Sequence, residues 1–248
     1  MVDIHSHILW GLDDGAKSLR ESVAMIHLAA ECGTSDIVAT PHADLRYAYQ
    51  PELVDAKIAE LAEASDNAVR IHRGCDFHLF LENIERAFAN PARYTINGRR
   101  YLLVEFSDLV IWDSTAGVFE RMLAAGMTPI ITHPERNLLL SANIDRIRGW
   151  VDAGCCVQLT AQSFLGRFGK EAKTACNEFM RQGLVHFVAS DAHDTKHRPP
   201  VLTTAFEHIA RHYGQACAQT LCITNPTNAL TGHPVTAAVP RPKKLLLD

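Results

Sequence analysis

Residues 1–15, MVDIHSHILWGLDDG, place two histidines two positions apart and two adjacent aspartates directly before a glycine. The short β-branched and apolar run that begins at Val2 predicts a β-strand. Because side chains on a strand alternate between its two faces, His5 and His7 project from the same face. Both imidazole rings can therefore reach one metal ion.

The two aspartates that follow this strand are expected to differ in role. Asp14 is the preferred metal ligand of the pair, with Gly15 behind it allowing the chain to turn sharply. Asp13 is expected to cap that turn. The preference for Asp14 leaves Asp13 open as the alternative ligand.

Six further short apolar runs follow at intervals of roughly thirty residues, the length of a βα unit. They span residues 35–42 (SDIVATPH), 69–77 (VRIHRGCDF), 99–107 (RRYLLVEFS), 127–135 (MTPIITHPE), 155–162 (CCVQLTAQ) and 184–193 (LVHFVASDAH). Between the first two runs, Ser18 and Glu21 predict a capping box at the start of an amphipathic helix. Similar helical patterns follow Pro51, Leu81, Ser114, Asn143, Gly169 and Thr203. This alternation predicts parallel strands with helices outside.

The position of polar residues favours a closed barrel over a doubly wound sheet. Side chains able to bind metal lie at the C-terminal end of nearly every run, namely His5, His7, His42, Asp76, Glu105, His133, Asp191 and His193. An open sheet gathers its site at one switch point, whereas a barrel brings all strand ends to one mouth. We therefore predict a single-domain α/β protein with a TIM-like barrel over residues 1–232. Residues 233–248, rich in proline, are expected to form a loosely docked extension.

The predicted ligands combine imidazole with carboxylate and include no thiolate, a mixture that suits manganese, iron or zinc. So many acids imply two or three ions, because carboxylates bridge metals. His78 lies two residues past Asp76 on the same strand face, and is either a second ligand or a substrate contact. The remaining histidines of the strands and helices are expected to pack or face solvent: His27, His72, His186, His208 and His212.

Two arginines stand beside the predicted ligands, Arg136 in THPERN and Arg198 in HRPP. Guanidinium groups bind phosphate oxygens in a bidentate manner, so the pair predicts a phosphorylated substrate. Both arginines are expected to bind this substrate and to act in catalysis. The sequence contains neither a Walker loop nor a GxGxxG motif, so nucleotide binding of the usual kinds is not indicated.

Composition limits the partners and the compartment. The net charge is −4 and the basic residues are dispersed, so no nucleic acid or anionic membrane is predicted as a partner. No apolar run reaches the roughly eighteen residues of a membrane span, and no signal peptide is evident, which leads us to expect a cytoplasmic protein. Seven cysteines without a CxxC pair predict reduced, mostly buried thiols rather than a disulfide framework or a thiolate zinc site.

Taken together, DIHSH, DDG, ATPH, VEF, THPER, ASDAH and RPP, in this order and at these intervals, resemble the PHP (polymerase and histidinol phosphatase) superfamily. More closely, they resemble its bacterial tyrosine-protein phosphatases, which are encoded with capsule and exopolysaccharide genes. The resemblance extends from Met1 to about Asn225 and implies a distorted (β/α)7 barrel with a trinuclear, usually manganese-dependent centre.

This resemblance also implies site residues. It assigns metal ligands to His5, His7, Asp14, His42, Glu105, His133, Asp191 and His193, and phosphate-binding roles to Arg136 and Arg198. Asp76 stands where the family often has glutamate, so this shorter acid is expected to bind through water or with help from His78.

The implied activity is hydrolysis of phosphotyrosine on an autophosphorylated bacterial tyrosine kinase. A phosphatase of a small metabolite such as histidinol phosphate is the alternative within the superfamily. A hydrolase of the amidohydrolase kind usually needs a bridging lysine or acid on a middle strand, and no lysine lies near the end of the fourth predicted strand. A regulatory protein without turnover is the third alternative, against which the nearly complete ligand set argues. Around the mouth, peptide anchors are expected at Arg46, Tyr47, Tyr49 and Trp112.

Overall fold

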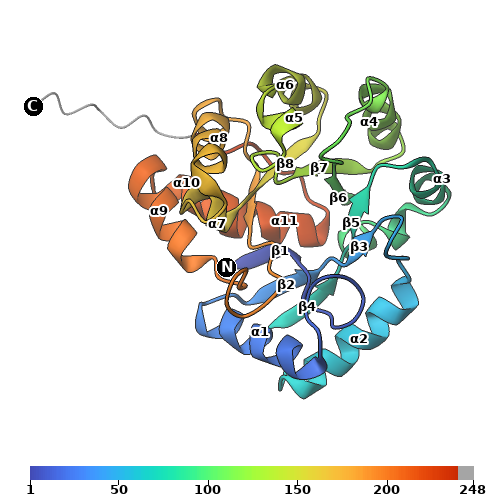
Figure 1. Ribbon diagram of the computed structural model, residues 1–248, viewed down its shortest axis with the longest axis vertical. Helices are drawn as coiled ribbons and strands as arrows, with labels where there is room; N and C mark the ends of the chain where they lie inside the picture. The colour runs from blue at the N-terminus through green and yellow to red at the C-terminus, as the bar shows by residue number, and fades with distance from the viewer. Residues whose placement is uncertain (240–248) are drawn as a thin grey trace, which may run out of the picture.

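The computed structural model describes residues 1–239, with the strands gathered at the centre and the helices around them (Figure 1). The strands are β1 (Val2–Ser6), β2 (Asp36–Ala39), β3 (His42–Ala43), β4 (Arg70–Arg73), β5 (Asp76–His78), β6 (Tyr101–Glu105), β7 (Thr128–Thr132), β8 (Cys156–Thr160) and β9 (Phe187–Ala189). The α-helices are α1 (Leu19–Glu31), α2 (Pro51–Ala64), α3 (Leu81–Ala89), α4 (Thr115–Ala124), α5 (Leu138–Ser141), α6 (Ile144–Asp152), α7 (Ala161–Phe164), α8 (Gly169–Arg181), α9 (Thr203–Tyr213), α10 (Gln215–Gln219) and α11 (Asn225–Thr231). Two 3-10 turns (Pro91–Arg93 and Ile96–Gly98) and a π-helical turn (Thr220–Thr224) complete the described elements.

Each of the seven predicted runs contains a strand, and every pairing between neighbouring strands is parallel. Two runs are each divided into two strands, β2 with β3 and β4 with β5. At the second division a Cβ atom on Gly74 would lie 2.7 Å from Cγ1 of Val38 and 2.9 Å from Cγ2 of Thr40, so only glycine fits between these neighbours.

The divisions separate the strands into a three-stranded sheet, β1-β2-β4, and a six-stranded sheet, β3-β5-β6-β7-β8-β9. Hydrogen bonds also link the end of β1 to the segment after β9: the Asp191 amide donates to His5 O over 2.9 Å, and the His7 amide donates to Ala192 O over 2.7 Å. The predicted single-domain α/β fold with parallel strands is confirmed. Across residues 1–239, however, the pairing yields two sheets and no closed barrel.

The predicted helix starts are found, with one change in the capping of α1. Ser18 Oγ accepts a hydrogen bond from the Glu21 amide over 3.3 Å, as expected of an N-cap. The Glu21 carboxylate accepts from the Lys17 amide over 2.8 Å, instead of from Ser18 as a capping box requires. The predicted second hydrogen bond of the capping box, from the Ser18 amide to Glu21, is therefore wrong. The Glu21 side chain extends one residue further and binds the Lys17 amide instead.

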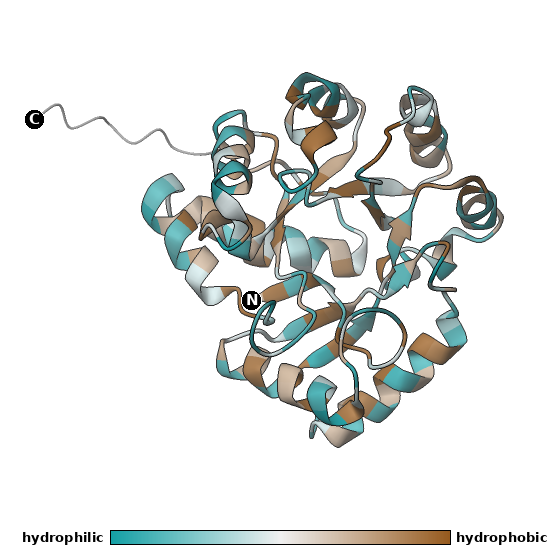
Figure 2. Ribbon diagram, viewed as in Figure 1, coloured by the Kyte–Doolittle hydropathy of each residue, from teal (hydrophilic) through white to brown (hydrophobic). Residues whose placement is uncertain are grey.

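The apolar core is divided by the strands into two layers, as β6 illustrates. Tyr101 and Leu103 belong to an inner cluster shared with β1, β7, β8 and β9, whereas Leu102 and Val104 pack outward against a cluster that includes Phe119 of α4. Figure 2 shows the mainly hydrophobic strands at the centre and hydrophilic residues on the outer helices. Because side chains alternate, Glu105 follows Leu103 on the inner face and carries a carboxylate to the end of the strand.

The start of the predicted C-terminal extension packs against the rest of the chain. Tyr101 Oη donates to His233 O over 2.8 Å, and the Ala238 amide donates to Val185 O over 2.8 Å. Residues 240–248, the remainder of that extension, lie outside the described part of the chain. Among residues 1–239, no helix combines the length and the apolar character needed to cross a bilayer.

Candidate metal centre

The predicted metal ligands lie near the C-terminal ends of the predicted runs, within or shortly after the strands β1, β3, β5, β6, β7 and β9. His5, His42, Asp76 and Glu105 lie within β1, β3, β5 and β6, and His133 directly follows β7. His7 and Asp14 follow β1, and Asp191 and His193 follow β9. Since parallel strands end at the same edge, these side chains converge although they are distant in sequence.

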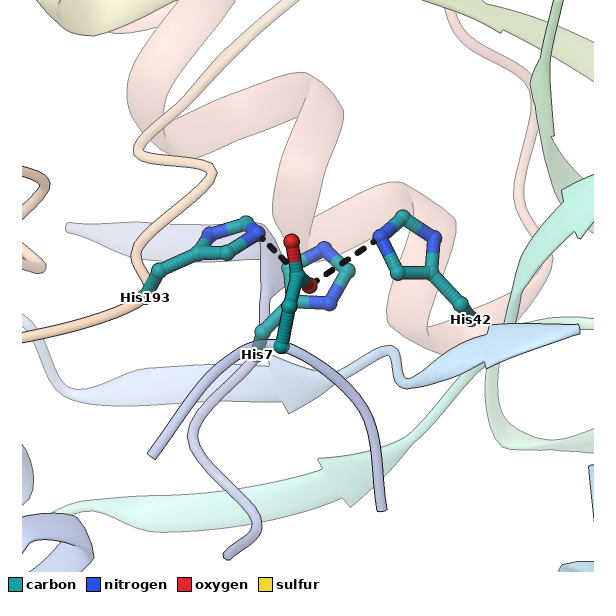
Figure 3. A group of neighbouring side chains, drawn as sticks. His7, His42 and His193 are labelled. Atoms are coloured by element: carbon teal, nitrogen blue, oxygen red, sulfur yellow. Dashed lines mark ion pairs between the residues drawn. The ribbon is translucent and has the colours of Figure 1, made fainter. Parts of the chain in front are cut away.

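The convergence forms three groups, each with ligand atoms within 4.8 Å of one another. The first contains His7, Asp14, His42 and His193, the second contains His42, Asp76, His78 and Glu105, and the third contains His5, His7 and Asp76. Figure 3 shows His7, His42 and His193 pointing toward one another, with dashed lines for the pairs that His42 and His193 make with Asp14. Three residues belong to two groups each, so the groups are contiguous.

His133 and Asp191 lie beside these groups. His133 Nε2 is 3.5 Å from Oε1 of Glu105, and Asp191 Oδ1 is 3.6 Å from Nε2 of His5 and 3.5 Å from Nε2 of His7. All the predicted ligands are therefore brought together, and His78 joins them with its Nε2 atom 2.8 Å from Oε2 of Glu105. His27, His72, His186, His208 and His212 belong to none of the three groups.

Several buried atoms of the predicted ligands make no hydrogen bond of normal geometry within the described residues, although ion-pair contacts such as that of His78 Nε2 with Glu105 Oε2 hold them close together. These atoms are His42 Nδ1, both carboxylate oxygens of Asp76, His78 Nε2 and Glu105 Oε2. Burying a polar atom without a partner costs free energy, so native structures rarely leave several such atoms in one place. Imidazole and carboxylate atoms that converge in this way fit divalent metal ions.

The electrostatics of the centre also favour added positive charge. Burial acts to lower the pKa of His5, but the carboxylates of Asp76 and Asp191 outweigh it and raise that pKa to about 9. Burial, with the charge of Asp76, raises the pKa of Glu105 to about 7. Carboxylates crowded at low solvent exposure thus hold protons on their neighbours. Metal ions would replace those protons.

The two arginines converge on one carboxylate of the ligand set. Arg136 and Arg198 both donate hydrogen bonds to Oδ2 of Asp191, whose other oxygen faces His5 and His7. Both guanidinium groups are partly exposed, and the Nε–H of Arg198 has no partner among the described residues. The arginines can therefore offer further donors to an anion beside the metal ligands.

Two predicted ligands hold unusual backbone conformations. His133 and Asp191 have φ angles of 32° and 53°, in the left-handed region that residues other than glycine seldom adopt. Both follow a strand directly or closely, where the chain turns away from the sheet. Strained positions of this kind cluster at functional sites, where the surrounding structure holds them.

Residues 1–231 match the family described as "Capsular polysaccharide synthesis, CpsB/CapC". The chain belongs to the CpsB/CapC family. CapC of Staphylococcus aureus is 37% identical over 210 residues, covering 83% of this chain and 82% of CapC. The tyrosine-protein phosphatase CpsB of Streptococcus pneumoniae is 33% identical over 235 residues, covering 91% of this chain and 96% of CpsB. The predicted relationship to the capsule-type tyrosine-protein phosphatases is thereby confirmed.

One solved structure agrees with membership of the CpsB/CapC family, and a second shares the fold. The first structure belongs to the set described as "Crystal structures of YwqE from Bacillus subtilis and CpsB from Streptococcus pneumoniae, unique metal-dependent tyrosine phosphatases". It has a TM-score of 0.87 at 29% sequence identity, and the alignment covers 98% of this chain and all of the other chain. A β-aspartyl dipeptidase from Fervidobacterium islandicum AW-1 has a TM-score of 0.58 at 12% identity, covering 96% and 75% of the two chains. The second likeness concerns the fold alone.

Three residues support the centre of this CpsB/CapC chain: Asp13, which was considered only as an alternative ligand, and Gln158 and Phe168, which were not among the predicted site residues. Asp13 Oδ2 accepts from Nδ1 of His7 over 2.7 Å, and Gln158 Oε1 lies 3.0 Å from Nδ1 of His5. The Phe168 ring lies against both arginines, with its centroid 4.2 Å from Cζ of Arg136 and 5.9 Å from Cζ of Arg198. Gln158 had a signal, since it is polar within the apolar run CCVQL.

The cysteines of this CpsB/CapC chain take no part in the centre. All seven are free, and six of them are buried. Burial raises the pKa of the Cys75 thiol well above its ordinary value, with a further increase from the charge of Asp76. A thiol held in this way is a poor nucleophile, since the thiolate is the reactive form. The predicted burial of most of the thiols is confirmed.

Proposed function

We propose that this protein is a metal-dependent protein-tyrosine phosphatase that hydrolyses the phosphomonoester of phosphotyrosine. One observation carries the proposal: a dense set of imidazole and carboxylate ligands lies beside two arginines that share a carboxylate with it. Its relatives in Streptococcus and Bacillus are named tyrosine-protein phosphatases, which supports the same activity here.

The metal ligands in this proposal are His5, His7, Asp14, His42, Asp76, Glu105, His133, Asp191 and His193. His78 contacts either an ion or the substrate, because it belongs to the second group and also lines the neighbouring pocket. We propose two or three divalent ions, with Mn²⁺ preferred over iron or zinc. Such ions would stabilise phosphoryl charge and lower the pKa of an attacking water molecule to about 7.

The arginines bind the phosphoryl group in this proposal. Guanidinium donors from Arg136 and Arg198 hydrogen-bond to the phosphoryl oxygens, orient the phosphorus for attack and stabilise the charge that develops there. Their shared contact with Asp191 keeps both donors beside the metal ligands. The phenol of tyrosine has a pKa of about 10, so its phenolate leaves without strong protonation.

The family supports a wider proposal about substrate, compartment and fold. We propose that the substrate is an autophosphorylated bacterial tyrosine kinase of capsular or exopolysaccharide synthesis, and that the phosphatase acts in the cytoplasm. We also propose that the two sheets together form the distorted (β/α)7 barrel of the PHP superfamily over residues 1–232. The contact between the β1 end and the segment after β9 supports this arrangement. Residues 233–248 would then be an extension of one catalytic domain.

An assay panel tests the function. The purified protein with MnCl₂ is given a phosphotyrosine peptide, a phosphoserine peptide, histidinol phosphate and an unphosphorylated amide. We expect phosphate release from the phosphotyrosine peptide, abolished by EDTA and restored by added metal. Activity confined to histidinol phosphate would replace the proposal with that of a metabolite phosphatase, and absence of turnover with any metal would favour a regulatory protein.

A further inference from the structure

A groove of about 660 Å³ opens beside the candidate metal centre. Three segments and Thr115 of α4 line it: residues 44–46 after β3, residues 78–80 starting at the last residue of β5, and residues 106–112 after β6. The strands β3, β5 and β6 each carry a predicted ligand. The groove is therefore built by the same strand ends that position the centre.

The lining of this groove is mainly apolar. Leu45 and Leu109 are 84% and 89% exposed, and Trp112 is 64% exposed. The two acids in the lining are already engaged, because Asp44 Oδ1 accepts from two backbone amides and Asp108 Oδ1 accepts from Asn137. Large apolar side chains gathered at one exposed groove indicate a binding surface rather than ordinary surface scatter.

The groove is continuous with the catalytic residues. His78 lines it and also belongs to the second metal group. Phe106 and Asp108 line both the groove and a smaller pocket of about 100 Å³. That smaller pocket also contains Glu105, His133 and Arg136. A molecule with its phosphoryl group at Arg136 can thus extend into the groove without leaving the surface.

The size of the groove indicates what extends into it. Pockets of roughly 300–1,000 Å³ enclose drug-sized ligands, so one phenol ring or one small metabolite would leave most of this space unfilled. A peptide that continues from the phosphotyrosine would bring neighbouring side chains to the apolar walls.

We propose that this groove binds the peptide segment next to the phosphotyrosine and selects a bulky apolar side chain there. The inference rests on the proposed function and adds to it a substrate preference. Leu109 and Trp112 on the β6 loop, with Leu45 on the β3 loop, form the walls that contact this side chain. Apolar contacts of this kind discriminate through the area they bury.

Two synthetic phosphotyrosine peptides and p-nitrophenyl phosphate test the preference. The peptides are identical except that leucine or glycine occupies the positions flanking the phosphotyrosine. We expect the wild-type protein to cleave the leucine peptide with a kcat/KM about tenfold higher than the glycine peptide. Trp112→Ala and Leu109→Asp should remove this difference and leave kcat/KM for p-nitrophenyl phosphate unchanged. Both side chains are exposed, so their replacement should not disturb folding.

Val239→Ser is the control, because Val239 is also an exposed apolar residue, with 83% of its surface exposed. It lies far from the groove: the preceding residue, Ala238, hydrogen-bonds to Val185 before the start of β9, at the end of the strands opposite the metal centre. This variant should retain the full preference for the leucine peptide. Equal cleavage of both peptides by the wild type would overturn the groove inference while leaving the phosphatase proposal in place. An equal loss on all three substrates in Trp112→Ala would also overturn it. Hydrolysis of histidinol phosphate alone would instead overturn the proposed function.

Discussion

The Nδ1 atom of His7 lies 2.7 Å from Oδ2 of Asp13. The same carboxylate accepts hydrogen bonds from the backbone amides of Gly15 and His42, over 2.9 Å and 3.1 Å. Asp13 thus holds two predicted ligands in position, through the Nδ1 atom of His7 and the backbone amide of His42. Oδ1 of Asp14 instead lies 3.4 Å from the Nε2 atoms of His42 and His193, within the first group of predicted ligands. The geometry gives the two adjacent aspartates different roles.

This difference predicts different effects of two matched substitutions. Asp13→Asn should weaken metal binding 10–100-fold, because it removes the carboxylate that fixes the His7 ring, yet activity should recover at saturating Mn²⁺. Asp14→Asn should lower the number of bound ions, and excess metal should not restore full activity. Metal titration with activity as the readout distinguishes the two. Full recovery of Asp14→Asn by added metal would reverse the assignment.

The sharing of ligands predicts metal stoichiometry. Asp76 belongs to two groups and His193 to one, so Asp76→Asn should lose more bound metal than His193→Ala. His212→Ala, at an exposed position on α9, is the control and should keep the wild-type content. Elemental analysis of the purified variants measures this order. An unchanged metal content in Asp76→Asn would exclude Asp76 as a shared ligand.

The parallel α/β fold and the convergence of the predicted ligands were largely predictable, because both depend on local patterns that repeat along the chain. Each strand run carries its polar residue at the same end, as Glu105 and His133 illustrate, and parallel strands bring like ends together. The order of residues alone therefore indicated which side chains would meet. The division of the β4 and β5 run was not predictable, because Gly74 is required by Val38 of β2 and by Thr40 directly after β2.

The residues that support the predicted ligands were harder to predict, because, like Gly74, they depend on contacts with residues from other parts of the fold. Phe168 precedes α8 in a loop and has no periodicity or motif to mark it, yet it lies against arginines that follow β7 and β9. The contact of Asp13 with His7 depends on a loop returning to its own strand. Such contacts arise from tertiary geometry, which sequence spacing does not encode.

His186 predicts acid sensitivity of the fold away from the metal centre. Burial lowers the pKa of His186 from 6.5 to about 4, and its Nδ1 atom accepts from the Val157 amide over 3.2 Å. The unfolded chain binds the proton first, so this contribution is complete above pH 6.5 and is lost as the pH falls toward 4. Between pH 7.5 and 5 the loss should be about 2 kcal/mol.

Urea unfolding in EDTA at both pH values measures that loss without a metal contribution. His186→Gln cannot take up the proton and should lose about 2 kcal/mol less than the wild type over the same interval. A parallel decline of the two proteins would show that His186 does not cause the acid sensitivity.

Phe168 predicts a specific effect on phosphate binding. Its ring lies against Arg136 and Arg198, and each cation–π contact is worth about 0.5–2 kcal/mol. Phe168→Leu keeps apolar bulk but removes the ring, so both guanidinium groups should lose their orientation toward a bound anion. We expect the inhibition constant of inorganic phosphate to rise about fivefold to tenfold, with unchanged metal content.

Phe168→Tyr is the control and should keep the wild-type inhibition constant, because a phenol keeps the ring face. Leucine and tyrosine variants that bind phosphate equally well would reduce Phe168 to a packing role, since only the cation–π contact distinguishes a ring from an aliphatic side chain here.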